Sequence, residues 1–213
     1  MATNLSDFVN GVMQHVSGCP KNLVIEEVRN AAIRLCEDST IWRDDIPAGD
    51  ITADVDDYTI TPPAGTRVMT LISLLYDDLT MYPKTEEELD HLDDGWRTGR
   101  PGDPNYFVLL APDRVKFNRI PEKTISNGLV AKVVLKPTNT ATTVADILFY
   151  DWFEAIKHGA LERLLRIPKK PWSDIKLSMF HGKHFNFQIQ RATARATSNF
   201  SRKPASVKMR KFV

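Results

Sequence analysis

The sequence predicts an α+β protein in which the N- and C-terminal segments form a helical bundle, with a β-rich insertion and a flexible basic C-terminal arm. Apolar residues recur at helical spacing near both ends of the chain. In the middle they alternate or form short runs bounded by Gly and Pro. The last residues are basic and carry Pro204. The expected units are a helical domain (1–47 plus 144–200), a β-rich insert domain (48–143) and a docking arm (201–213).

Two helices are expected in the N-terminal segment. The first covers 6–16, where apolar residues recur at i, i+4 and i+8. The second begins at an Asn22 N-cap and ends near Asp38, and Cys36 falls on its apolar stripe. The stretch 44–50 is acidic and contains Pro and Gly, which predicts a polar loop that leaves the bundle.

The central segment is expected to hold about five strands and one helix. The run 67–76 predicts a strand buried on both faces. Alternation over 129–136, with Leu129, Ala131, Val133 and Leu135 on one face, predicts another strand. Thr85 and Glu88 have capping-box spacing at the start of a short helix. The remaining strands are expected at 58–61 and in a hairpin over 106–118.

Helical spacing returns after the insertion. Thr143 and Asp146 again have capping spacing, and an i, i+4 stripe continues to a stop at Pro168. A last helix is expected from Asp174 to near Asn199. Both ends of the chain are therefore expected to pack into one bundle.

Charge is strongly segregated along the chain although its sum is only +1. Residues 1–95 hold 6 basic and 19 acidic side chains, a net charge of −13. Residues 96–150 hold 8 and 4, and residues 151–213 hold 14 and 4, which gives +4 and +10. A subunit that places one charged end against an oppositely charged neighbour gains complementarity and register.

The motifs of common catalytic and metal sites are missing from the sequence. There is no phosphate-binding Gly-rich loop and no nucleophile elbow. His181 and His184 are three residues apart, whereas zinc proteases place two histidines four apart around a glutamate. His158 is expected to be packed and Cys36 to lie in the core, while Cys19 is a weaker nucleophile candidate. We expect no enzyme activity, no cofactor and no metal.

The two cysteines do not make a disulfide framework, which favours a reducing compartment. No secretory signal and no apolar run of membrane-spanning length occurs. A membrane partner is therefore not expected.

The basic C-terminus has three interpretations. It can be a nucleic-acid patch, although a single aromatic residue is poor for base stacking. It can be an arm that docks on an acidic protein groove through apolar anchors, or a solvated terminus. Docking is the favoured interpretation, and its residues are Arg202, Lys203, Val207, Lys208, Met209, Arg210, Lys211 and Phe212.

Three groups of motifs follow one another along the chain. They are Ala31-Ala32-Ile33-Arg34-Leu35-Cys36 with Trp42-Arg43-Asp44, then Trp96, Gly99, Pro101 and Pro104-Asn105-Tyr106, then Tyr150, Ala155-Ile156-Lys157-His158-Gly159-Ala160-Leu161 and Lys170-Pro171-Trp172. Their order resembles the head-to-tail adaptor proteins of tailed bacteriophages, also called connector or tail tubular proteins. The resemblance spans about residues 5–200.

The resemblance implies a ring, typically of about twelve copies, between the capsid portal and the next tail component. It implies helices around a channel for double-stranded DNA, a β-rich part directed outward or towards a nozzle or tail fibre protein, and a C-terminal segment that reaches the portal. The location would be the neck or tail of a virion assembled in the host cytoplasm. An acidic lining would not grip DNA, which points to Glu26, Glu27, Glu37 and Asp38 as channel-lining candidates.

Two alternatives remain open. One is a nucleic-acid-binding accessory protein that uses the basic C-terminus. The other is a hydrolase or nuclease that uses the acidic clusters with a divalent ion.

Overall fold

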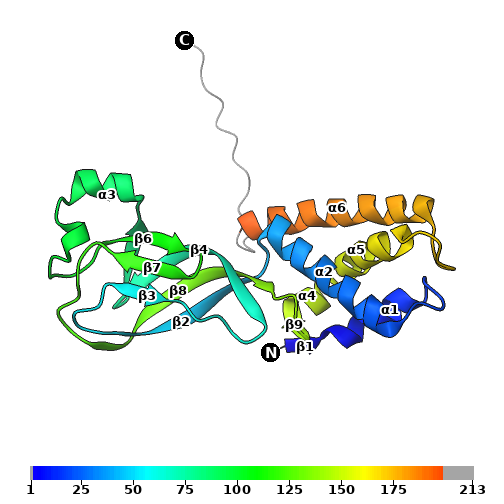
Figure 1. Cartoon of the computed structure of the whole chain (residues 1–213), viewed down its shortest axis with the longest axis horizontal. Coiled ribbons are helices and arrows are strands. Elements are labelled where there is room, and N and C mark those ends of the chain that lie inside the picture. Colours follow the sequence, from blue (N-terminus) through cyan, green and yellow to red (C-terminus); the bar gives the residue numbers. More distant parts are fainter. Residues whose placement is uncertain (1, 199–213) are drawn as a thin grey trace, which may run out of the picture.

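The computed structural model describes residues 2–198, which form two lobes along one long axis (Figure 1). The helical lobe occupies one end of the molecule and the β lobe the other. Long strands of the β lobe reach the junction, where α2 contacts β8. The same hydrophobic core continues through both lobes, so neither lobe is a separately packed unit.

The helical lobe contains six helical segments. These are η1 (Leu5–Phe8), α1 (Val9–Met13), α2 (Lys21–Ser39), α4 (Asp146–Tyr150), α5 (Phe153–Arg166) and α6 (Ile175–Thr197). Helix α5 lies between α2 and α6 and packs on both. The three long helices meet at Gly159, where an added Cβ would lie 2.9 Å from both the Ala31 Cβ and the Phe185 ring. Glycine therefore permits the close approach of the helices.

Sequence signals account for the long helices. The apolar stripes of α2, α5 and α6 are all buried, as helical periodicity predicts. Asp174 caps α6 by accepting a hydrogen bond from the Leu177 amide at 3.0 Å. Helix α2 ends at Thr40, which has a left-handed backbone with φ of 52°.

A two-stranded sheet fastens the N-terminus to the helical lobe. Strand β1 (Ala2–Asn4) pairs antiparallel with β9 (Thr143–Ala145), where the chain returns from the β lobe. The Thr3 hydroxyl also donates a hydrogen bond to the Asp146 carboxylate at 2.7 Å. The start of the chain is therefore held beside the start of α4.

The β lobe is a seven-stranded sheet with the order β2-β8-β4-β5-β6-β7-β3. Its strands are β2 (Arg43–Ile51), β3 (Asp57–Thr59), β4 (Thr66–Tyr76), β5 (Leu79–Pro83), β6 (Tyr106–Ala111), β7 (Arg114–Phe117) and β8 (Ile125–Pro137). Neighbouring strands are antiparallel except β5 and β6, which are parallel. The helix α3 (Glu86–Leu92) and the short η2 (Trp96–Thr98) follow β5 and lie at the outer end of the lobe (Figure 1).

Strand β8 makes the longest pairings of this sheet, because it pairs along most of its length with both β2 and β4. Leu129, Ala131, Val133 and Leu135 are completely buried, as their alternation predicts. Across the sheet, the Tyr58 ring stacks on Phe117 with centroids 4.8 Å apart. These contacts make the sheet a large part of the core.

The expected fold class, a helical bundle with a β-rich insertion, is wrong. Helices hold 41% and strands 30% of the structure, so the protein is mixed α/β with a large, nearly closed sheet. The sheet does not begin after the bundle, because β2 starts at Arg43 and the stretch 44–50 is a strand instead of a polar loop. Cross-strand partners of β2 lie about 80 residues away on β8, and local composition does not reveal such pairing.

Several elements differ from the sequence expectations. The helix expected over 6–16 is a 3-10 turn followed by five α-helical residues. Helix α2 has Pro20 as its N-cap residue instead of Asn22. Thr143 lies in β9, and the helix expected there is divided into α4 and α5. Strand β4 is not buried on both faces, because Ile72 is 39% exposed. The capping box of Thr85 and Glu88 is confirmed.

Candidate functional site

Four histidines from three segments gather in the helical lobe. The Nδ1 atom of His158 on α5 lies 2.7 Å from the Nδ1 atom of His181 on α6. The His184 ring stacks on His158 at 5.2 Å, and the His15 ring lies 6.0 Å from His181. The expectation that His158 is packed is met, since its side chain is 17% exposed. Within residues 2–198, no three His, Cys, Asp or Glu side chains are arranged to hold a metal ion.

The inner two histidines favour the neutral form. Burial, then the neighbouring imidazoles, lower the pKa of His181 to about 4. Burial and His184 also lower the pKa of His158, while Glu154 opposes this shift. A pair that shares one hydrogen between two Nδ1 atoms must have one donor and one acceptor, which a doubly protonated pair cannot provide.

Neither cysteine has the surroundings of a nucleophile. Cys36 is completely buried on α2, and burial raises the pKa of its thiol far above its usual range. Cys19 is 4% exposed, and burial raises its thiol pKa as well. The structure therefore places both thiols with packing residues, including Cys19, for which the sequence left a reactive role open.

Two surface pockets flank α3. The first, of about 420 Å³, is lined by Pro83, Lys84, Thr85, Glu86, Glu88, Val108 and Leu109. The second, of about 350 Å³, is polar and contains Arg100 and Arg119 on either side of Asp93. The Asp93 carboxylate lies 3.8 Å from Arg100 and 3.7 Å from Arg119, so it offsets their charge. Neither pocket brings together a nucleophile, a base and an oxyanion donor.

The four expected channel-lining carboxylates on α2 do not act as a uniform acidic surface. Glu27 forms an ion pair with Arg163, and Glu37 pairs with Lys136. Asp38 lies 3.4 Å from Arg34. Glu26 is exposed and forms no ion pair within the described part of the chain. The repulsion that such a surface exerts on DNA phosphates is therefore weaker than the sequence suggests.

The expected docking arm, with all its candidate residues from Arg202 to Phe212, lies outside the described residues. The same is true of Asn199 and Phe200, where the last helix was expected to end.

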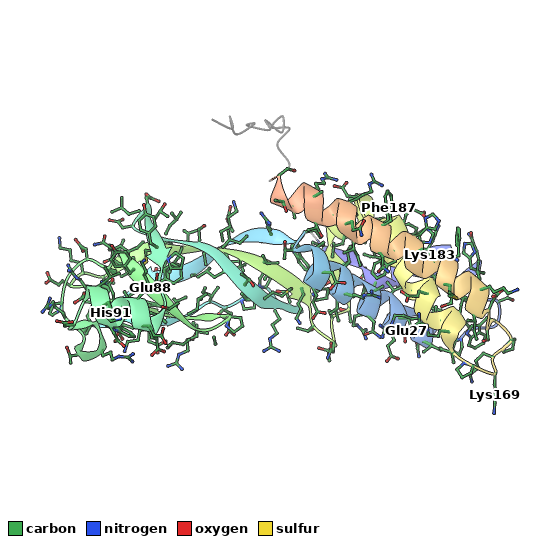
Figure 2. All side chains as sticks on the ribbon, turned by 90° about the horizontal axis from the view of Figure 1, so that it is seen from above. Glu27, Glu88, His91, Lys169, Lys183 and Phe187 are labelled. Carbon is green, nitrogen blue, oxygen red and sulfur yellow. The ribbon has the colours of Figure 1, made fainter. Side chains whose placement is uncertain are left out.

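Helix α6 has a second, outward apolar stripe that the sequence analysis missed. Phe180 and Phe187 are 51% and 57% exposed and lie two helical turns apart, on the side opposite the buried stripe. Lys183 lies between them, and Figure 2 shows Lys183 and Phe187 on the open side of α6. The sequence did contain a signal for this stripe, because two phenylalanines seven residues apart and outside the buried stripe indicate a second contact face of the helix.

Comparison with known proteins adds no family to these observations. A scan against protein-family models finds no match for the chain, and a search of curated proteins also finds none. Among residues 2–198, no helix is long and apolar enough to cross a membrane.

Proposed function

We propose that this chain is a structural subunit of a tailed-bacteriophage virion. In this role it forms a ring, of about twelve copies as in the family it resembles, between the portal and the distal tail. Double-stranded DNA passes through the ring without specific binding, and a nozzle or fibre protein binds on the distal side. The subunit performs no reaction of its own.

The observation that carries this proposal is the segregation of charge along the chain, together with the two-lobed shape of the subunit. Residues 151–213 hold 14 basic and 4 acidic side chains, whereas residues 1–95 hold 6 and 19. Such a subunit offers different surfaces to different neighbours, which a heterologous ring requires. The order of motifs along residues 5–200 adds the resemblance to head-to-tail adaptors.

The test is assembly on a portal. The full chain is mixed with the portal protein encoded in the same genome and viewed by negative-stain electron microscopy. We expect a ring added to one face of the portal. The variant that lacks residues 201–213 should lose most of this binding, because the arm supplies the basic and apolar docking residues.

A matched control separates docking from folding. The truncated variant should keep the thermal unfolding midpoint of the full chain, because the core of the described structure is formed by residues 2–198, all of which the variant retains. If the full chain stays monomeric at every concentration and never binds the portal, the proposal is wrong.

A second candidate function is nucleic-acid binding through the C-terminus, favoured by the five basic side chains between Arg202 and Lys211. In that case a short duplex DNA should bind the full chain at low salt, and affinity should fall steeply as salt is added. Loss of this binding on removal of residues 201–213, without any portal association, would favour the second function over the first.

A further inference from the structure

The outward side of α6 has the spacing of a helix-packing seam. Phe180, Phe187 and Ala194 recur every seven residues, and Lys176, Lys183 and Gln190 recur beside them with the same period. All six residues are exposed. Two rows with a seven-residue period side by side resemble the a and d positions of a coiled coil. Here the first row is apolar and the second row is polar. We call this stripe the α6 seam.

The α6 seam is basic as well as apolar. Helix α6 contains Lys176, Lys183, Arg191 and Arg195, and no acidic residue. Lys176 and Lys183 form no ion pair within residues 2–198. Met179 beside the seam is 58% exposed, which adds aliphatic surface. A partner for this stripe must therefore supply carboxylates together with apolar contacts.

The helical lobe carries such a surface on another side. The rings of Phe8, Phe149 and Phe153 pack together, with centroids between 5.1 and 5.5 Å apart. In the sequence, Asp7 precedes Phe8, Tyr150 follows Phe149 and Glu154 follows Phe153. Asp7 and Glu154 are exposed, and Tyr150 is 76% exposed. We call these residues, with Asp146 at the start of α4, the α4 surface.

The α4 surface is acidic, and most of it lies at a different edge of the helical lobe from α6. The two come close where Arg195 of α6 pairs with Asp151, the residue after Tyr150, at 2.8 Å. It holds three carboxylates, and Glu154 among them lies 2.7 Å from the Lys157 Nζ and 4.0 Å from the His158 Nε2. In Figure 1, α6 runs along the upper edge of the helical lobe, whereas β1, α1 and α4 lie along its lower edge. Within residues 2–198, helix α6 packs on α2 and α5, and the seam residues on its outer side are exposed.

We propose that the α6 seam of one copy docks on the α4 surface of the next copy. Basic residues and phenylalanines on one side would meet carboxylates and an exposed tyrosine on the other. Because the two surfaces differ and lie on different sides of one lobe, the contact is heterologous and repeats from copy to copy. This inference rests on the proposed ring and names the surfaces that build it.

A protein partner fits the seam better than nucleic acid does. Duplex DNA offers phosphates to the lysines but no sites for the exposed phenylalanine and methionine side chains. Single-stranded DNA can stack on aromatic rings, so it is retained as an outcome of the test. The acidic complement on the same lobe favours a second copy.

Cross-linking between introduced cysteines tests the contact. The full chain receives Phe187→Cys in the seam and Tyr150→Cys in the α4 surface, and a flexible bis-maleimide is added over a concentration series and on the portal. We expect a ladder of dimers, trimers and larger species from the double variant. The native Cys19 and Cys36 are buried and should contribute little background.

Single-site variants provide matched controls. Each single variant alone should give no ladder, and a mixture of the two should stop at dimers. The pair Leu79→Cys and Tyr150→Cys should also give no ladder, because Leu79 is 70% exposed but lies on the β lobe. A second measurement uses Phe180→Ser with Phe187→Ser, which should weaken self-association at least about tenfold without lowering the unfolding midpoint.

Each other outcome overturns the inference in a distinct way. Dimers from Phe187→Cys alone would indicate contact between two α6 helices. Tight binding of oligo-dT that the two serine substitutions abolish would assign the seam to single-stranded DNA. Rings or oligomers without the ladder would reject these surfaces and leave the proposed ring intact. No association in any condition would reject both proposals.

Discussion

The Nδ1 atoms of His158 and His181 lie 2.7 Å apart and join α5 to α6 inside the helical lobe. The groups that face this pair are His15, His184, Lys157 and Glu154. Burial, and then His15, His184 and Lys157, lower the pKa of both rings, so protonation of the pair is opposed from several sides. We therefore expect the contact between the two helices to depend on pH.

We expect the free energy of unfolding to fall as the pH is lowered from about 6.5 to about 4. The pKa of His181 is about 4 in the native state, and an unfolded histidine titrates near 6.5, so the unfolded chain binds more protons in this range. The part of the loss that comes from His181 should be on the order of 1–3 kcal/mol and should be complete below about pH 4. Urea unfolding at a series of pH values measures it.

The variant His181→Gln should have a flatter pH dependence than the wild type over the same range. His91→Gln is the control, because His91 is exposed on α3 and far from the pair. If the wild type and both variants lose unfolding free energy in parallel as the pH is lowered, the histidine pair does not control stability in acid.

Gly159→Ala should destabilise the protein by about 1–3 kcal/mol. Its new Cβ would lie 2.9 Å from the Ala31 Cβ and the Phe185 ring, and neither neighbour can move without shifting a helix. Gly182→Ala is the matched control on α6, where the nearest atom is 3.1 Å away and belongs to the flexible Glu162 side chain. Thermal unfolding should show a clear loss for the first variant and a change within about 1 kcal/mol for the second.

Asp78→Gly should stabilise the β4–β5 hairpin by about 0.5–1 kcal/mol. Asp77 and Asp78 form a two-residue turn between paired Tyr76 and Leu79, with φ values of 45° and 63°. Asp113→Gly is the control, because its turn between β6 and β7 does not require positive φ. Chemical denaturation should show a gain for the first variant and no gain for the second. Equal changes in the two variants would contradict the argument that the positive φ of Asp78 favours glycine there.

Asn118→Ala should cost about 2–3 kcal/mol, measured by urea unfolding. Asn118 is 2% exposed, and its Oδ1 accepts hydrogen bonds from the amides of Asn105 and Tyr106 at 3.2 and 3.0 Å. Its removal leaves these donors without a partner at the start of β6. Asn105→Ala, at an exposed position, should change stability by less than about 0.5 kcal/mol. Similar losses for both variants would argue against this role.

The candidate surfaces could be predicted from the sequence only in part. The basic character of α6 and the absence of acidic residues after Asp174 can be counted directly. The outward position of Phe180 and Phe187 depends on which side of α6 packs on the rest of the lobe, and in the structure Phe185 and Ile189 lie on that buried side. The neutralisation of Glu27 by Arg163 joins residues far apart in the sequence, and no local pattern reveals it.

The sequence alone determined the elements whose signals are local. Helical periodicity placed α2, α5 and α6, alternation over 129–136 placed β8, and the spacing of Thr85 and Glu88 marked the start of α3. These signals are reliable because they depend only on residues close together in the sequence, which lie on one face of an element or form one cap in any fold.

Only the tertiary structure decided the size of the sheet, the pairing of β2 with β8, the parallel contact of β5 with β6, and the meeting of His158 with His181. Each of the three contacts joins segments that are about 20 or more residues apart in the sequence. Many alternative pairings of the strands and helices would satisfy the same local patterns. The choice among them is made by burial of the whole core, a property that no single segment carries.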